Sequence, residues 1–145
     1  MTEIEKLLPH REPFLFVDEI IEANREKITA RYTFTGKEFF FQGHFPEYPV
    51  VPGVILIETM AQAGVSGLRK LNILSTNGLI YLATVDKVKF RRPVRPMEEV
   101  ILEIKNLEIS PKMIKQSGKA NIGNEIAAEA EWMCVICQEG INVRS

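Results

Sequence analysis

The stretch from Val54 to Leu68, VILIETMAQAGVSGL, decides how this chain folds. It is almost wholly apolar, and Glu58 is its one charged residue. Pro52 and Gly53 come directly before it and mark the point where a helix begins. The pattern predicts a buried helix from Val54 to about Leu71, because apolar residues surround every face of the helix rather than one stripe.

Strand patterns lie on both sides of this helix in the sequence. Apolar residues alternate at every second position from Lys27 to Phe34, which is typical of a half-buried strand. After the helix come further segments of strand character, which are Leu79 to Val85, Val88 to Val94, Val100 to Ile109, Lys112 to Ile122 and Glu125 to Ile136. One long helix and a run of strands joined by short turns predict an α+β fold, with an antiparallel sheet packed on the helix.

Size and charge narrow the classes of function. The 145 residues suit a single domain over 1–145, and a net charge of −1 gives no general attraction to nucleic acid or to an anionic membrane. The N-terminus lacks the basic start and apolar run of a signal peptide. No membrane span is expected, because the longest apolar stretch carries Glu58 near its centre. We therefore expect a cytoplasmic protein.

Cys134 and Cys137 form a C-x-x-C pair that has to be weighed as a redox or zinc motif. The surrounding residues alternate as in a strand, where residues three apart point to opposite faces. A structural zinc site would need four ligands, and the chain has two cysteines and two histidines. We expect two reduced thiols and no metal.

Glu58 is the residue that does not fit a purely structural helix. An unpaired carboxylate is costly to bury, so it either finds a partner or its pKa rises toward neutrality. Both outcomes are typical of a general acid or base. Gln62 lies one turn further along the same face, where it can hold Glu58 or a water molecule. A buried glutamate with a structural partner remains the alternative.

The loop before the helix carries a second candidate for proton transfer, His44. Histidine suits proton transfer near neutral pH, and the prolines of QGHFPEYPVVPG stiffen the path from His44 to the helix. The backbone amides of Gly53 and Val54 at the helix start have no intrahelical acceptor and can bind an oxygen that gains negative charge. His44 as a turn residue, and Gly53 as the glycine that permits the turn, are the structural alternatives.

Three blocks of the sequence together resemble the FabZ-type (3R)-hydroxyacyl-[acyl-carrier-protein] dehydratases. They are LPHREPFLFVDEI at Leu8 to Ile20, GHFPEYPVVPGVILIETMAQ at Gly43 to Gln62, and LATVDKVKFRRPV at Leu82 to Val94. The similarity runs from near residue 7 to about residue 137 in matching order. The middle block is the most specific, because it keeps the fourteen-residue gap from His44 to Glu58.

The resemblance implies a hot-dog fold, in which an antiparallel sheet wraps around one long central helix. It also implies a homodimer that joins two sheets, with a trimer of such dimers as a larger assembly. In the family the histidine of one protomer faces the helix carboxylate of its mate, so each site is shared.

By position, the resemblance makes His44 and Glu58 the catalytic pair, Gln62 their support and the Gly53 amide the group that binds the substrate carbonyl. Glutamate rather than aspartate on the helix favours dehydration without isomerisation. The chain departs from the family at Glu47, where glycine usually follows His-Phe-Pro, and at Met97, where the usual turn is Pro-Gly-Asp. Glu47 places the substrate preference in doubt more than the reaction.

The implied reaction is a 1,2-elimination that gives a trans-2-enoyl thioester on acyl carrier protein in fatty acid biosynthesis. No metal or organic cofactor is expected, since no nucleotide fingerprint or cluster of metal ligands appears in the sequence. The alternatives are a hot-dog acyl-thioester hydrolase and a non-catalytic acyl-binding protein.

A basic stretch completes the candidate site. The resemblance assigns it to the acidic carrier protein and its phosphopantetheine arm, while a solvated strand face is the structural alternative. Tyr81 and Phe90 flank this stretch and are candidates for lining an acyl tunnel, or for core packing. His10 is expected to support the loop that leads into the site. The cations of the stretch are Lys87, Lys89, Arg91, Arg92 and Arg95.

Overall fold

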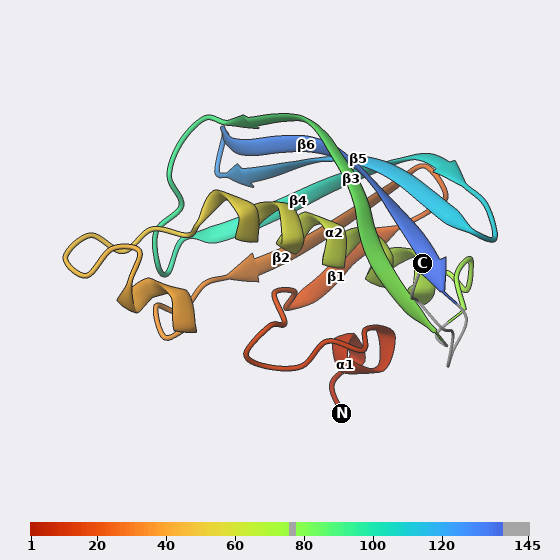
Figure 1. Ribbon diagram of the computed structural model, residues 1–145, viewed down its shortest axis with the longest axis horizontal. Coiled ribbons are helices and arrows are strands. Elements are labelled where there is room, and N and C mark those ends of the chain that lie inside the picture. The colour runs from red at the N-terminus through yellow and green to blue at the C-terminus, as the bar shows by residue number, and fades with distance from the viewer. Residues whose placement is uncertain (76–77, 138–145) are drawn as a thin grey trace.

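In the computed structural model, which describes residues 1–75 and 78–137, a six-stranded antiparallel sheet wraps around one long helix (Figure 1). The strand order across the sheet is β1-β2-β4-β5-β6-β3. The expected α+β arrangement of a sheet around a central helix is confirmed, while residues 138–145 of the expected domain lie outside the described residues. The elements in chain order are α1 (Glu3–Leu7), β1 (Glu19–Ala23), β2 (Lys27–Thr33), the 3-10 helix η1 (Phe39–Gln42), α2 (Gly53–Lys70), β3 (Leu79–Phe90), β4 (Glu99–Ile109), β5 (Met113–Ile122) and β6 (Glu125–Cys137).

Helix α2 forms the centre of the core. Every residue from Ile55 to Arg69, a stretch described in full, is buried except Glu58. The helix lies close against the sheet because it has a glycine at the contact, where a Cβ on Gly64 would overlap the side chain of Gln116 on β5. Burial on nearly all sides explains why apolar residues lie on every face of the helix and not in one stripe.

The strand β3 corrects one prediction. The segments Leu79 to Val85 and Val88 to Val94 were expected as two strands, but the structure has one strand that ends at Phe90. An irregularity between Asp86 and Lys89, with Lys87 at φ 53°, bends this strand without interrupting it, which is how a β-bulge acts. Beyond Phe90, Pro93 has no N–H to donate to a strand ladder.

Three short elements near the N-terminus carry no clear periodic pattern and were not predicted. Helix α1 has five residues, and a capping box between Thr2 and Glu5 stabilises its N-terminal end. Strand β1 lies at the edge of the sheet opposite β3 and buries one side chain, Ile20, so its sequence shows no alternation. The 3-10 helix η1 lies in the loop that leads to His44.

The remaining sequence expectations concern the thiols and the membrane. Cys134 is buried on the core face of β6, Cys137 is half-buried, and neither forms a disulfide. Among the described residues, no group of three or more His, Cys, Asp or Glu side chains gathers as metal ligands would. No helix in the described part combines the length and hydropathy needed to cross a bilayer.

Candidate active site

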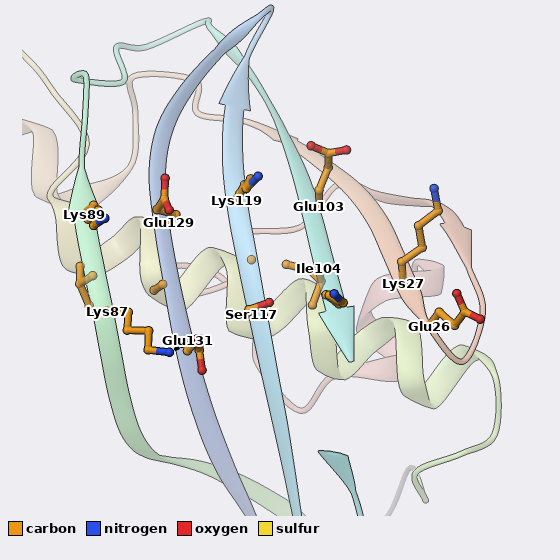
Figure 2. Close-up of a pocket in the computed structure, with 14 residues that line it drawn as sticks. Glu26, Lys27, Lys87, Lys89, Glu103, Ile104, Ser117, Lys119, Glu129 and Glu131 are labelled. Atoms are coloured by element: carbon orange, nitrogen blue, oxygen red, sulfur yellow. Dashed lines mark ion pairs between the residues drawn. The ribbon is translucent and has the colours of Figure 1, made fainter. Parts of the chain in front are cut away.

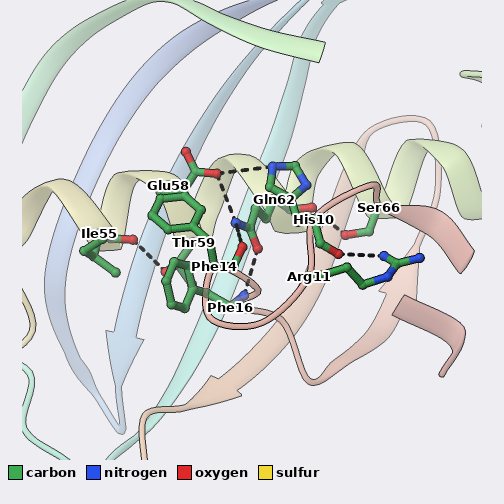
Figure 3. A network of polar contacts seen from close by, with 9 residues as sticks. All are labelled: His10, Arg11, Phe14, Phe16, Ile55, Glu58, Thr59, Gln62 and Ser66. Carbon is green, nitrogen blue, oxygen red and sulfur yellow. Dashed lines mark hydrogen bonds and ion pairs between the residues drawn. The ribbon is translucent and has the colours of Figure 1, made fainter. Parts of the chain in front are cut away.

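Glu58 is the one residue between Ile55 and Arg69 of α2 that is not buried. Its side chain is 23% exposed, and Oε2 accepts a hydrogen bond of 3.0 Å from Nε2 of Gln62 (Figure 3). Burial raises the pKa of the Glu58 carboxyl, and the Gln62 hydrogen bond opposes that rise in part. Oε1 has no hydrogen-bond partner among the described residues. The expected pairing of Glu58 with Gln62 is therefore present.

The orientation of the Gln62 amide is fixed by the loop between α1 and β1. The backbone N–H of Phe16 donates to Gln62 Oε1 at 2.8 Å, and Nε2 donates to the carbonyl of Phe14 at 3.2 Å. Because a backbone N–H can only donate, the amide oxygen must face Phe16. The nitrogen then faces Glu58, and Gln62 is a donor to the carboxyl group in either protonation state.

His44 is held by its own loop in a defined tautomer. Its Nδ1 lies 2.9 Å from the carbonyl oxygen of Val50, which can only accept. In the neutral ring the proton must therefore lie on Nδ1, which leaves Nε2 as a free base. The ring stacks on Phe45 with centroids 4.2 Å apart. Nε2 is thus the nitrogen available for proton transfer.

An open hollow of about 610 Å³, here called the His44 hollow, lies beside the first turn of α2. Its lining includes His44, Gly53, Val54 and Phe90. Pro52 caps the helix without a side-chain hydrogen bond, so the first amides of α2 face this region uncapped. A Cβ on Gly53 would lie 2.7 Å from the Phe90 ring, so only glycine allows this ring to rest on the helix start.

Within one chain the two candidate catalytic residues lie in different places. His44 lines the His44 hollow, whereas Glu58 lines a separate cavity of about 30 Å³ together with His10, Gln62 and Cys134. We call this second space the Glu58 cavity. The His44 hollow does not include Glu58 in its lining, and the Glu58 cavity does not include His44. A single chain therefore does not unite the predicted pair in one pocket.

The structure adds a neighbour to His10 that the sequence did not reveal. It was expected to support the loop that leads into the site, and its Nε2 lies 3.6 Å from Oε2 of Glu58 (Figure 3). Its Nδ1 is buried and has no hydrogen-bond partner among the described residues. The one available signal was its position in the LPHREP block, which does not show that this loop folds back onto α2.

The five cations of the basic stretch do not form one face. Lys87 and Lys89 line a hollow of about 660 Å³ on the face of the sheet that α2 does not cover (Figure 2). Arg91 and Arg92 line the His44 hollow instead. The guanidinium of Arg95 lies 4.8 Å from the centre of an exposed tyrosine ring. The arginines, rather than the lysines, are therefore next to the candidate site.

Most of these cations already have an acidic neighbour in the chain, which reduces the charge that they offer to a partner. The ion pairs are Lys87 with Glu131 at 3.0 Å, Arg91 with Glu129 at 2.8 Å, and Arg92 with Glu98 at 3.0 Å.

Of the two candidates for an acyl tunnel, Phe90 lines the His44 hollow. Tyr81 is 41% exposed on β3 and lines neither the His44 hollow nor the Glu58 cavity.

The two departures from the family pattern lie at exposed turns. Glu47 is in the tight turn in which Phe45 and Tyr48 exchange backbone hydrogen bonds of 3.2 and 3.1 Å. Met97 has φ 72°, a left-handed conformation, and its side chain is 71% exposed. Glycine adopts a left-handed backbone more readily than methionine does, which agrees with the Pro-Gly-Asp turn of the family pattern.

Sequence comparison identifies relatives along nearly the whole chain. The model of the FabA-like domain matches residues 8–131. The 3-hydroxyacyl-[acyl-carrier-protein] dehydratase FabZ of Thermoanaerobacter pseudethanolicus is 42% identical over 140 residues, which cover 95% of this chain and 97% of that protein. The FabZ dehydratase of Koribacter versatilis is 44% identical over 138 residues, with 94% and 88% covered.

Solved structures show the same architecture at low sequence identity. The dehydratase heterocomplex ApeI:P from Xenorhabdus doucetiae superposes with a TM-score of 0.80 at 16% identity, over 96% of this chain and 93% of that one. A putative thioesterase from Ralstonia eutropha gives 0.61 at 12% identity, with 81% and 83% covered. At these identities the likeness supports the hot-dog fold and no particular reaction.

Proposed function

The chain belongs to the FabA-like family as a 3-hydroxyacyl-[acyl-carrier-protein] dehydratase of the FabZ type, and on this premise we propose that His44 and Glu58 are its catalytic base and acid. The observation that carries the proposal is the contact between Nδ1 of His44 and the Val50 carbonyl, which leaves Nε2 bare as a base. Burial raises the pKa of the Glu58 carboxyl, which favours the protonated form that a general acid needs. An elimination requires both a base and an acid.

The base acts on carbon 2 of the 3-hydroxyacyl chain. The thioester makes the C2 protons mildly acidic, and neutral His44 takes one of them on Nε2. Hydrogen bonding of Nδ1–H to the carbonyl of Val50 then steadies the imidazolium that forms. Negative charge moves onto the thioester oxygen, which the uncapped amide of Gly53 stabilises at the start of α2.

The acid acts on carbon 3. Glu58 gives its proton to the departing hydroxyl group, directly or through a water molecule, and becomes a carboxylate. The C2 electron pair forms the new double bond as water departs, so the product is a trans-2-enoyl thioester. No redox change occurs, and neither a metal nor an organic cofactor enters any step.

Glu58 and His44 lie in separate spaces within one chain, and a homodimer would bring the two residues together across its interface. The edge strand β3 has an unpaired side and exposes large apolar side chains, which favours pairing with a second copy. Antiparallel pairing about a two-fold axis would bring the Phe90 end of one β3 beside the Leu79 end of the other. The exposed large apolar side chains of β3 are Leu79, Tyr81, Leu82, Val85 and Phe90.

These two ends of β3 belong to the two halves of the site. Phe90 lines the His44 hollow, whereas Ile80 and Leu82 line the Glu58 cavity. Pairing of the strands therefore brings the partner's His44 toward Glu58, and the reverse. We propose two shared sites per homodimer, with a trimer of dimers as the larger assembly.

The acyl carrier protein is the proposed macromolecular partner, and the site has to admit its phosphopantetheine arm. Arg91 and Arg92 at the His44 hollow are the cations best placed to meet an acidic carrier, and rim charges of this kind mainly speed encounter. The other cations of the predicted carrier patch, Lys87, Lys89 and Arg95, do not line this hollow. A place in cytoplasmic fatty acid biosynthesis follows from such a carrier-bound substrate.

One assay separates the proposed reaction from its alternatives. Purified enzyme is given a (3R)-hydroxyacyl carrier substrate, and the ultraviolet absorbance of the conjugated enoyl thioester is followed together with release of free thiol. A dehydratase gives enoyl absorbance without thiol. Thiol release without enoyl product would identify a thioester hydrolase, and binding without either product would identify an acyl-binding protein.

A further inference from the structure

His10 lies against the proposed acid without an assigned part in the reaction. Its ring comes from the segment between α1 and β1, and its Nε2 lies 3.6 Å from Oε2 of Glu58 (Figure 3). That segment is anchored from two sides. Buried Arg69 donates to the carbonyl of Leu7 at 3.0 Å, and Arg11 donates to the carbonyls of Leu8 and His10 at 2.8 and 2.6 Å.

The surroundings of the imidazole select one protonation state and one tautomer. Nε2 faces an acceptor, whereas Nδ1 is buried and finds no partner among the described residues. A proton on Nδ1 would leave a buried N–H without an acceptor, which is costly, so the neutral ring carries its proton on Nε2. Burial and the guanidinium groups of Arg69 and Arg11 also lower the pKa of His10.

Two side-chain nitrogens therefore lie near one oxygen of Glu58. Gln62 Nε2 donates to Oε2 at 3.0 Å, and Nε2 of His10 lies 3.6 Å from that same atom. Donors on Oε2 favour carbonyl character there, so the proton of the neutral carboxylic acid resides on Oε1. Oε1 is also the oxygen without a partner among the described residues.

We propose that His10 is a positioning residue for the dehydration: it donates from Nε2–H to Oε2 of Glu58 and so presents Oε1 as the oxygen that delivers the proton. This inference rests on the proposed role of Glu58 as the acid. The separation of 3.6 Å is too long for a hydrogen bond in the free enzyme. Catalytic contacts are often long in the free enzyme and shorten in the complex with substrate.

Few charged or titratable groups of the same chain lie around Glu58, so a shift in its pKa can be assigned to a change at His10. Arg69 of α2 and Cys134 of β6 line the same cavity, and Arg11 lies in the segment of His10. Burial raises the pKa of the Cys134 thiol to about 12, so it stays neutral through the working range. Loss of the His10 donor would raise the pKa of Glu58, because a donor favours the charged form.

The test compares His10→Leu with His10→Gln in the full-length enzyme, using the enoyl absorbance assay across pH. We expect His10→Leu to lower kcat by about tenfold, the size of one hydrogen bond to a charged group, with little change in KM. The alkaline limb of its kcat–pH profile, where the acid loses its proton, should shift to higher pH by about one unit. His10→Gln retains a side-chain N–H at similar reach and should restore most of both properties.

Arg11→Met is the matched control, because it removes the hydrogen bonds of Arg11 to this segment and keeps the imidazole of His10. It should lower the melting temperature without moving the alkaline limb. If Arg11→Met reproduces the His10→Leu profile, or if His10→Leu keeps the wild-type kcat and limb, the positioning role is wrong. Glu58→Gln is measured alongside: if it keeps full activity, the proposed acid itself is wrong, and the two failures are distinguished.

Discussion

Gln62 Nε2 lies 3.0 Å from Oε2 of Glu58, one helical turn further along α2. The contact joins two polar residues on a helix that is otherwise packed on nearly all sides. Two backbone groups of the loop at Phe14 and Phe16 hold the Gln62 amide, so the carboxyl group is oriented by the N-terminal loop and not by the helix alone.

Glu58→Gln should keep the fold and lower turnover by at least about a hundredfold, the lower range for a general acid or base. The amide oxygen of the new side chain can still accept from Gln62, so the loss is confined to the proton. Steady-state rates on a carrier-bound 3-hydroxyacyl substrate measure the effect. Turnover near that of the wild type would remove Glu58 from the mechanism.

The same variant should change how stability depends on pH. Burial raises the folded-state pKa of Glu58 above its unfolded value of about 4.3, so the folded chain holds a proton that the unfolded chain has lost. The wild-type protein therefore loses stability as pH rises from the unfolded-state pKa through the folded-state pKa of Glu58. Glu58→Gln has no carboxyl group at this position, so it does not lose this stability. Its melting temperature should match the wild type near pH 4 and exceed it at pH 7; a constant difference would contradict the raised pKa.

The sequence was enough to predict the long helix and the polar pair on it, because both follow from local pattern. Val54 to Leu71 was expected as a helix and Gly53 to Lys70 is observed. Glu58 was singled out because it is the one charge in an apolar run, and the structure gives it the expected Gln62 partner.

The contact of His10 with Glu58 could not be predicted in the same way. It joins residues 48 positions apart, and nothing in the local pattern shows that the segment after α1 returns to the middle of α2. The separation of His44 from Glu58 is also a property of tertiary structure. Their spacing along the chain fits a catalytic pair, but the loop before α2 places His44 in one space of the protomer and α2 places Glu58 in another.

Reversing charge at the His44 hollow should impair the enzyme toward its carrier more than toward a small substrate. Arg91→Glu with Arg92→Glu is expected to raise KM for the carrier-bound substrate by about tenfold or more, because rim charges steer encounter. Activity on a pantetheine-linked mimic, which lacks the acidic protein surface, should change far less. Initial rates on both substrates at low and high salt provide the measurement.

The matched control for that variant removes the same ion pairs and keeps the cations. Glu129→Gln frees Arg91 from its partner at 2.8 Å, and Glu98→Gln with Glu125→Gln frees Arg92 from its partners at 3.0 and 3.7 Å. This control should preserve or improve use of the carrier-bound substrate. Equal losses on both substrates, or the same loss in the control, would show that the arginines serve folding and not the carrier.

Met97→Gly should stabilise the protein without affecting catalysis. Residue 97 has φ 72°, which costs an L-residue about 1–2 kcal/mol, while glycine loses about 0.5–1 kcal/mol of that gain to chain entropy. The exposed methionine side chain contributes little packing. Chemical denaturation should show a gain of about 0.5–1 kcal/mol. Met97→Ala, which keeps a Cβ, should show no such gain; equal gains would exclude backbone strain as the cause.

Mixing two inactive variants tests whether each site is shared between protomers. A dimer of one His44→Ala chain and one Glu58→Gln chain would hold one intact site and one site that lacks both groups. Random re-pairing makes about half of the dimers mixed, each with one working site of two. Activity should therefore return to roughly a quarter of the wild-type value by this symmetry argument.

The recovery has to be separated from failed exchange, since protomers that aggregate or do not exchange would also leave the mixture inactive. Wild-type enzyme taken through the same dissociation and re-pairing sets the upper limit of recovery. A co-expressed heterodimer, purified through two different tags, removes the need for exchange and should reach about half of wild-type activity, because every dimer then holds one intact site. A pure heterodimer that stays inactive would show that His44 and Glu58 of the same chain must act together, and the pairing of two β3 strands would lose its main support.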